Sequence, residues 1–384
     1  MIYSTRHYTT ADTWTYQTDW WNYLAANGWG GITTLNDNGG NYTTIWYFII
    51  SVCIQLHLYP QLPIEFCIKG IAVLCTLLSS VCMYYTVKHF RPKSAYMPAA
   101  SALSVLFLPS FLFDILKTNL PDAVYLMFCL YSFQCFVKKR RWPAWLLLGF
   151  GICFKLMAIY LAPVYIYFYV KNFHRYKFGS KLSPLSGIFA LILCSLPYMI
   201  CGGGFFNAII GPSLNRTDDA MRMNSFSLWT FLPNDMGYFK LFSIALLAMT
   251  MFATAYYIFH FMESKRRRNI DYPLLPTLSA ALCYFILPAQ HESFFTLAAV
   301  FSLIGFAIMV KKPYLIIFIL LNALLFFAYA WVGFNWWIGD SVFFTEPIIA
   351  PILAIAFAFT IGYCYYLIFF NSTLSPKYKS SGMP

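Results

Sequence analysis

Charged residues are scarce in this sequence, which excludes an ordinary soluble globule. Asp, Glu, Lys and Arg make up 10% of the 384 residues, whereas hydrophobic residues make up 60%. Soluble domains average about 25% charged residues, and long apolar runs are typical of membrane proteins. We therefore expect an all-α polytopic membrane protein, because helices satisfy their own backbone hydrogen bonds in lipid.

Acidic residues are the scarcer of the two charged kinds. The chain has 14 Asp and Glu against 26 Lys and Arg, which gives a net charge of +12. In a soluble protein this excess would suggest nucleic-acid binding. Here the basic residues lie in short loops between apolar runs, where they act as topology signals. We therefore expect membrane lipids as partners and no nucleic acid.

Two motifs of disulfide and metal chemistry are absent. The 11 cysteines contain no CxxC pair, and those inside apolar runs include Cys53, Cys75, Cys82, Cys129, Cys153, Cys194 and Cys364. Such cysteines behave as small core residues. There is no Asp-x-Asp pair, although two acids from different loops could hold a divalent ion. The sequence thus predicts no certain cofactor and leaves metal dependence open.

Long hydrophobic runs, by contrast, are abundant. We predict membrane spans near residues 65–87, 98–116, 122–137, 182–202, 240–262, 273–289, 293–310, 313–332 and 345–371. The run from Trp142 to Val170 is too long for one helix and contains Lys155 and Pro163. It predicts two short or broken helices that meet near Lys155. The bundle would then have about eleven spans.

The first part of the chain is expected to lie outside this bundle. Thr44 to Tyr59 is apolar but short, which favours a helix in the membrane interface. We expect residues 1–64 to form an extracytoplasmic loop with interfacial helices, 65–371 the transmembrane bundle and 372–384 a cytoplasmic tail. Because signal-led export is the commoner route, we favour a first span upstream of Met1, missing from this chain, over an exported N-terminal tail.

Charges separate between the two sides of this arrangement, and of the acids only Glu263 and Asp271 lie in a basic loop. One side receives Lys88, Arg91, Lys93, Lys138 to Arg141, Lys171, Arg175, Lys177, Lys181, Lys265 to Arg268, Lys311, Lys312, Lys377 and Lys379. The other receives Asp12, Asp19, Asp37, Asp114, Asp122, Asp218, Asp219, Asp235, Glu292, Asp340 and Glu346. Basic loops stay cytoplasmic, so the acidic side should be extracytoplasmic. Its ionisable groups fall at helix ends rather than near mid-bilayer, which favours an enzyme acting on a lipid-held substrate over a transporter.

Several short motifs follow one another in a fixed order. They are Asp12 with Trp20 eight residues later, "NGWGG" from Asn27, "NYTT" from Asn41, "TNLPD" ending at Asp122, "FKLMA" around Lys155, "MNSFSLWTFLP" from Met223 and "HESFF" from His291. Their order and topology resemble the integral-membrane glycosyltransferases of the C superfamily (GT-C), in particular bacterial mannosyltransferase-like proteins related to the second mannosyltransferase of GPI-anchor synthesis. The sequence departs from that pattern in four places: Asp19 replaces a Pro, the Pro-Pro pair after "NY" is absent, "TNLPD" has lost a Gly and a Gln, and Ser293 replaces an Arg.

The resemblance implies a glycosyltransferase of a bacterial cell membrane. It would move a hexose, for example mannose, from a polyprenyl-phosphate donor to a glycan or glycolipid acceptor on the outer face, with inversion. Such chemistry needs a carboxylate base for the acceptor hydroxyl and cations for the leaving phosphate. We expect Asp12 as the base. Further catalytic or substrate-binding candidates are Asp19, Asp122, Asn224, His291 and Glu292; the phosphate candidates are Lys155, Arg216 and Arg222; the sugar-stacking candidates are Trp14, Trp20 and Trp229.

Each assignment has a structural alternative. Tryptophans on outer loops often anchor a protein at the interface, and Asp19 could cap a helix that begins at Trp20. His291 and Glu292 could form an interfacial pair. Lys155 is harder to explain structurally, because burying an unpaired ammonium costs several kcal/mol. For the whole chain, the alternatives are a lipid-linked sugar flippase, which would need paired charges near mid-span, and an inactive accessory subunit of a polysaccharide assembly complex.

The charge pattern gives a testable topology. A cysteine introduced at Thr33 should react with a membrane-impermeant thiol reagent in intact cells, and one introduced at Arg267 should not. A permeant reagent, which should label both, is the control. The opposite labelling pattern would contradict the orientation.

Overall fold

The computed structural model describes residues 17–35, 42–113, 115, 122–209, 225–231, 245–246, 248–257, 272–288, 290–338 and 346–369. Every regular element in these ranges is a helix, which confirms the all-α polytopic class. Five helical stretches are long and apolar enough to cross a membrane: Ile64–Phe90, Tyr96–Phe113, Leu156–Arg175, Lys312–Ala330 and Ala350–Phe369. Shorter apolar helices lie beside them, and the total of about eleven spans stays a prediction.

The main bundle follows the predicted spans closely. Its helices are α5 (Ile64–Phe90), α6 (Tyr96–Leu106), α7 (Pro109–Phe113), α8 (Asp122–Val137), α9 (Arg141–Phe154), α10 (Ala162–Asn172), α12 (Leu185–Ile200), α16 (Leu275–Ile286), α17 (Thr296–Met309), α18 (Lys312–Ile338) and α19 (Glu346–Phe369). One large hydrophobic core runs through all of these helices except α12. The predicted span at 240–262 is described only at 245–246 and 248–257.

The predicted helix break at Lys155 is present. α9 ends at Phe154, and Lys155 adopts an extended conformation with φ −152° and ψ 124°. The chain continues as the 3₁₀-helix η5 (Leu156–Leu161) before α10 begins. Pro163 lies in the first turn of α10, where its missing N–H leaves no intrahelical hydrogen bond unmade. The break therefore places a charged residue between two helical segments without burying it in a helical turn.

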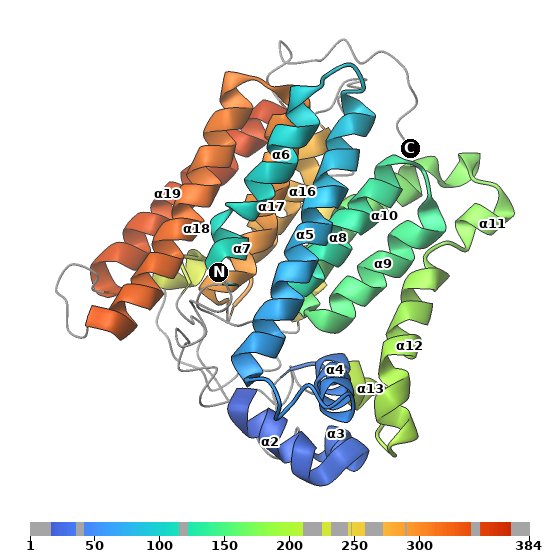
Figure 1. Cartoon of the computed structure of the whole chain (residues 1–384). Coiled ribbons are helices and arrows are strands. Elements are labelled where there is room, and N and C mark those ends of the chain that lie inside the picture. The colour runs from blue at the N-terminus through green and yellow to red at the C-terminus, as the bar shows by residue number, and fades with distance from the viewer. Residues whose placement is uncertain are drawn as a thin grey trace.

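The N-terminal helices form a unit with its own core, which we call the outer unit. It comprises α2 (Thr18–Asn27), η2 (Gly28–Gly30), α3 (Gly31–Thr34) and α4 (Thr44–Gln55). Its buried side chains include Trp20, Trp21, Leu24, Ile32, Trp46, Tyr47 and Ile50, which pack with the start of α5. Figure 1 shows this unit at one end of the bundle. α4 confirms the short helix expected in 44–59; its position in the membrane interface stays a prediction.

The described basic turns gather at the opposite end. The turns that follow α5, α8 and α10 all lie at the end of the bundle away from α2 and α4 (Figure 1). These turns and the helical residues next to them carry Lys88, Arg91, Lys93, Lys138 to Arg141, Arg175, Lys177 and Lys181. The described part of the chain therefore keeps the two groups of charges apart along the bundle, as the positive-inside pattern requires.

Candidate functional site

Three of the sequence motifs meet at the end of the bundle next to the outer unit. Asp122, from "TNLPD", is the first residue of α8, and Lys155, from "FKLMA", occupies the break after α9. Their side chains form a buried ion pair. The Lys155 ammonium also donates to Ser293 Oγ of "HESFF" at 3.4 Å, a long hydrogen bond. Segments separated by up to 138 residues are thus joined at one lysine.

The ion pair is almost completely shielded from solvent. Lys155 is 9% exposed and Asp122 is 1% exposed. Isolated charges at such depth would each cost several kcal/mol, so each partner makes the other's burial tolerable. The helix ends assist, because Asp122 lies at the positive end of the α8 dipole and Lys155 follows the negative end of α9.

One carboxylate oxygen of Asp122 takes no part in the ion pair. Asp122 Oδ2 is buried and accepts no hydrogen bond from any residue that the structure describes. An ionised carboxylate can accept about four hydrogen bonds, and an unmet buried acceptor is unfavourable. Asp122 therefore has the capacity to accept a further donor, such as a hydroxyl group of a bound ligand.

Aromatic rings surround the ammonium. The Lys155 nitrogen lies 4.9 Å from the centre of the Phe294 ring and 5.7 Å from that of Tyr125. Both distances are within the range of cation–π attraction. The Tyr125 hydroxyl is hydrogen-bonded to Thr296 Oγ1 at 2.6 Å, which fixes this ring between α8 and α17. The rings exclude water while still stabilising positive charge.

A second set of polar groups orders the segment before "HESFF". Tyr160 donates from its hydroxyl to Gln290 Oε1 at 2.6 Å, and Gln290 Nε2 donates to the Pro288 carbonyl at 2.9 Å. Ser279 in turn donates to the Tyr160 carbonyl at 2.6 Å. The sequence analysis did not single out Tyr160 or Gln290. The sequence marks them only weakly as site residues, because each is a single polar group beside an apolar run.

His291 and Glu292 directly precede Ser293, the residue that accepts a hydrogen bond from Lys155. Glu292 begins the 3₁₀-helix η9 (Glu292–Phe295), and His291 immediately precedes it. The partly exposed His291 ring contacts the ring of Phe294 with centroids 5.2 Å apart. The same Phe294 faces Lys155, so His291 lies one side chain away from the ammonium.

The aromatic candidates have structural contacts of their own. Trp20 is only 2% exposed and packs against Tyr42 and Tyr47, which leaves its ring little surface for a sugar. Trp229 lies in η7 (Leu228–Phe231), and its indole N–H donates to the Ile286 carbonyl at 2.8 Å. This bond ties η7 to the end of α16.

Asp19 is exposed and is not the cap of its helix. α2 begins at Thr18 rather than at Trp20, and Asp19 lies in its first turn. The N-cap residue is Gln17, whose side chain makes no capping hydrogen bond. The helix was expected to begin at Trp20, with Asp19 as its cap. It begins two residues earlier, so Asp19 lies inside the helix. A carboxylate in the first turn still complements the helix dipole.

The other candidates fall outside the described residues: Asp12, Trp14, Arg216, Arg222 and Asn224. Within the described ranges, no three His, Cys, Asp or Glu side chains come together as a metal site would require.

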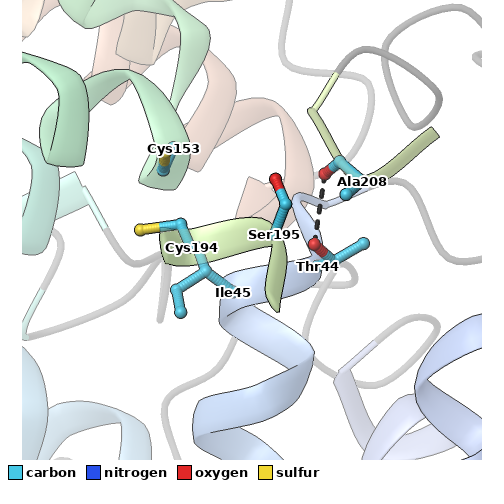
Figure 2. Close-up of a pocket in the computed structure, with 6 residues that line it drawn as sticks. All are labelled: Thr44, Ile45, Cys153, Cys194, Ser195 and Ala208. Atoms are coloured by element: carbon cyan, nitrogen blue, oxygen red, sulfur yellow. Dashed lines mark hydrogen bonds between the residues drawn. The ribbon is translucent and has the colours of Figure 1, made fainter. Parts of the chain in front are cut away.

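A small pocket lies where the outer unit meets the bundle. Figure 2 shows its lining by Thr44, Ile45, Cys153, Cys194, Ser195 and Ala208. The Thr44 hydroxyl donates to the Ala208 carbonyl of α13 (Phe205–Ile209) at 3.1 Å. The pocket has room for about one water molecule and is too small for a sugar. The pocket marks the contact between the outer unit and the bundle. A 3.4 Å hydrogen bond from Thr43 Oγ1 to the carbonyl of Phe154, next to Lys155, also connects the two parts.

Comparison with known proteins agrees with this picture. Residues 47–200 match the sequence profile of the dolichyl-phosphate-mannose-protein mannosyltransferase family, which belongs to the GT-C superfamily. The resemblance to GT-C membrane glycosyltransferases is confirmed. The match runs from α4 through α12 and contains both Asp122 and Lys155. The narrower relation to the second mannosyltransferase of GPI-anchor synthesis stays a prediction. No curated protein matches the sequence.

The burial of the ion pair predicts strong coupling between its partners. Asp122→Asn should destabilise the protein by about 3–5 kcal/mol, because it leaves an ammonium buried without its counter-charge. The double variant Asp122→Asn/Lys155→Met should recover a large part of that loss. Thermal unfolding of the single and double variants in detergent measures the coupling. Additive effects of the two substitutions would show that the charges do not depend on each other.

Proposed function

We propose that the chain transfers a hexose, such as mannose, from a polyprenyl-phosphate donor to a hydroxyl of a glycan or glycolipid at the extracytoplasmic face of a bacterial membrane. One observation carries the proposal: a buried lysine, held by an acid at a helix break, lies in the family-matched segment and at the end of the bundle opposite the basic turns. A cation in such a site can bind a phosphate strongly, because it is poorly screened by water.

The proposed reaction is a single inverting displacement. Asp12 takes the proton of the acceptor hydroxyl while the acceptor oxygen bonds to the anomeric carbon. The bond between that carbon and the phosphate oxygen breaks, and polyprenyl phosphate leaves with the electron pair. Lys155 stabilises the charge that develops on the phosphate. Asp122 holds the ammonium in place through the ion pair, and its free Oδ2 can accept a hydroxyl of the donor sugar.

The remaining candidates have supporting parts in this proposal. Arg216 and Arg222 assist at the phosphate, and Asn224, His291 and Glu292 contact the substrate. Trp14 and Trp229 provide stacking surface for a sugar, whereas Trp20, which is buried, packs the outer unit. Asp19, which is exposed, has no part in the chemistry.

A lipid-linked sugar flippase is the second candidate, and the ion pair gives it a supporting observation. A flippase would need paired charges, and Lys155 and Asp122 form such a pair. However, both charges lie at helix ends, whereas transporters use ionisable groups near mid-bilayer. The shortened "TNLPD" motif leaves the inactive accessory subunit as a third reading.

Release of the carrier distinguishes these functions. The purified chain is incubated with a labelled polyprenyl-phosphate sugar and an acceptor glycolipid, and liberated polyprenyl phosphate is measured. Asp12→Asn should lower turnover by roughly 10² to 10⁴, the usual contribution of a general base. Donor binding should change little, because the lost interaction matters chiefly in the transition state.

Asp19→Asn is the matched control. It makes the same chemical change on an exposed helix turn and should leave turnover within about threefold. Near-normal turnover of Asp12→Asn with an inactive Asp19→Asn would assign the base to Asp19 instead. No carrier release by the wild-type chain would favour the flippase or the accessory subunit.

A separate prediction concerns the donor phosphate. Lys155→Met should weaken binding of the lipid-phosphate donor by about tenfold or more, because one charge-assisted hydrogen bond is worth roughly 1.5–3 kcal/mol. Equilibrium binding of a fluorescent donor measures this affinity. Lys69→Met is the control, since Lys69 is equally buried but lies in α5 beside Ile68 of the outer core. Unchanged donor affinity in a folded Lys155→Met variant would make Lys155 purely structural.

A further inference from the structure

The end of the bundle away from the outer unit has a concentrated positive surface, which we call the basic corner. It consists of Arg140 and Arg141 at the start of α9 together with His174, Arg175, Lys177 and Lys181. The second group lies in η6 (Phe173–Arg175) and around α11 (Phe178–Lys181). All six are at least partly exposed. None has a part in the proposed transfer reaction.

Direct contacts hold the two groups of the basic corner together. The Arg141 guanidinium lies 3.8 Å from the centre of the Tyr176 ring, and it donates to Ser180 Oγ at 3.4 Å. Trp142 donates from its indole N–H to the Gly179 carbonyl at 3.1 Å. Lys181 lies over the ring of Phe173 at 4.7 Å. The cations are therefore presented on an ordered surface rather than on a free loop.

Among the residues whose side chains the structure describes, no carboxylate balances this charge. The sequence has no Asp or Glu between Asp122 and Asp218, so neither α9 nor the 173–181 segment supplies one. From other elements, the acids whose side chains the structure describes are Asp19, Glu65 and Asp122, and these belong to the opposite end. Arg141 Nε is buried without a hydrogen-bond partner among the described residues. Two arginines also stand at the start of α9, where the helix dipole disfavours positive charge.

Exposed apolar side chains lie beside the basic corner. Phe178 is 77% exposed and Trp142 is 45% exposed, and Leu182 and Leu185 follow on the same segment. Aromatic and apolar side chains next to lysines and arginines are typical of a surface at the level of lipid headgroups. The apolar groups would lie among the upper acyl chains while the cations meet the phosphates.

We propose that the basic corner is a binding site for the phosphate headgroup of an anionic phospholipid. The uncompensated cations supply the charge complementarity, the planar Arg141 supplies hydrogen-bond donors for phosphate oxygens, and Trp142 and Phe178 contact the acyl chains. The site is independent of the proposed transfer reaction and lies at the other end of the molecule. It gives the protein a fixed attachment to negatively charged lipid in the leaflet that faces the basic turns.

Lipid titration of the purified full-length chain tests the site. The protein in neutral detergent is titrated with phosphatidylglycerol or phosphatidylcholine, and bound lipids are counted by native mass spectrometry. The wild-type protein should retain more phosphatidylglycerol than phosphatidylcholine. Each basic residue near an anionic lipid contributes about fivefold in affinity, so Lys177→Gln/Lys181→Gln should lose about 25-fold for phosphatidylglycerol and little for phosphatidylcholine.

The matched control is Lys88→Gln/Lys93→Gln. It removes the same charge from the last turn of α5 and the exposed turn that follows it, and it should change the affinity by about twofold or less. An equal loss in both double variants would overturn the proposal in favour of diffuse net charge. Equal retention of the two lipids would also overturn it, as would displacement of phosphatidylglycerol by inorganic phosphate at equal concentration. Unchanged thermal unfolding of the variants shows that the fold is retained.

Discussion

A charged lysine inside an apolar bundle needs an acid, and much of the architecture at this end of the protein meets that need. Lys155 can reach Asp122 only because the helix stops at Phe154 and leaves the lysine in an extended conformation. Asp122 can pair with this lysine because α8 begins at Asp122, so its carboxylate lies at a helix end. The 3₁₀-turn η9 then brings Ser293 and Phe294 over the same nitrogen. Removing any of these backbone features would leave a buried charge without its partner.

The two ends of the bundle carry different chemistry. At one end Lys155 is enclosed and paired with Asp122, which suits selective recognition of one ligand group. At the other end several cations are exposed and meet no carboxylate in the part of the chain that the structure describes, which suits the many phosphates of a lipid surface. The same residue types thus serve two purposes, and burial rather than composition decides between them.

Most helices could be predicted from the sequence, because the residues next to each helix end mark where it begins and stops. α8 begins and ends where the span was predicted, since Pro121 precedes it and a basic turn follows it. The break at Lys155 was also predictable, because a lysine and a proline interrupt an overlong apolar run. The start of α2 was displaced by two residues because no side chain caps it, and helix ends without a cap leave little trace in sequence.

Long-range partners could not be predicted in this way. Asp122 and Lys155 are 33 residues apart, and no periodic pattern links them. Trp20 appeared exposed in a polar segment, but Tyr42 and Tyr47, which bury it, come from a different helix and the turn before it. Such pairings follow from how helices pack, which a one-dimensional hydrophobic pattern does not specify.

The separate core of the outer unit has a consequence for cooperativity. Its buried tryptophans belong to a cluster that includes the start of α5 and Tyr198 of α12, while the bundle has a core of its own. Structures divided in this way open in stages, because local opening requires only the contacts of one unit to be lost. Amide hydrogens of α2 and α4 would then exchange with solvent at a lower free energy than those of α8 and α17. Because Thr43 is hydrogen-bonded to the carbonyl of Phe154, such an opening would loosen the chain beside Lys155 while the bundle stays folded.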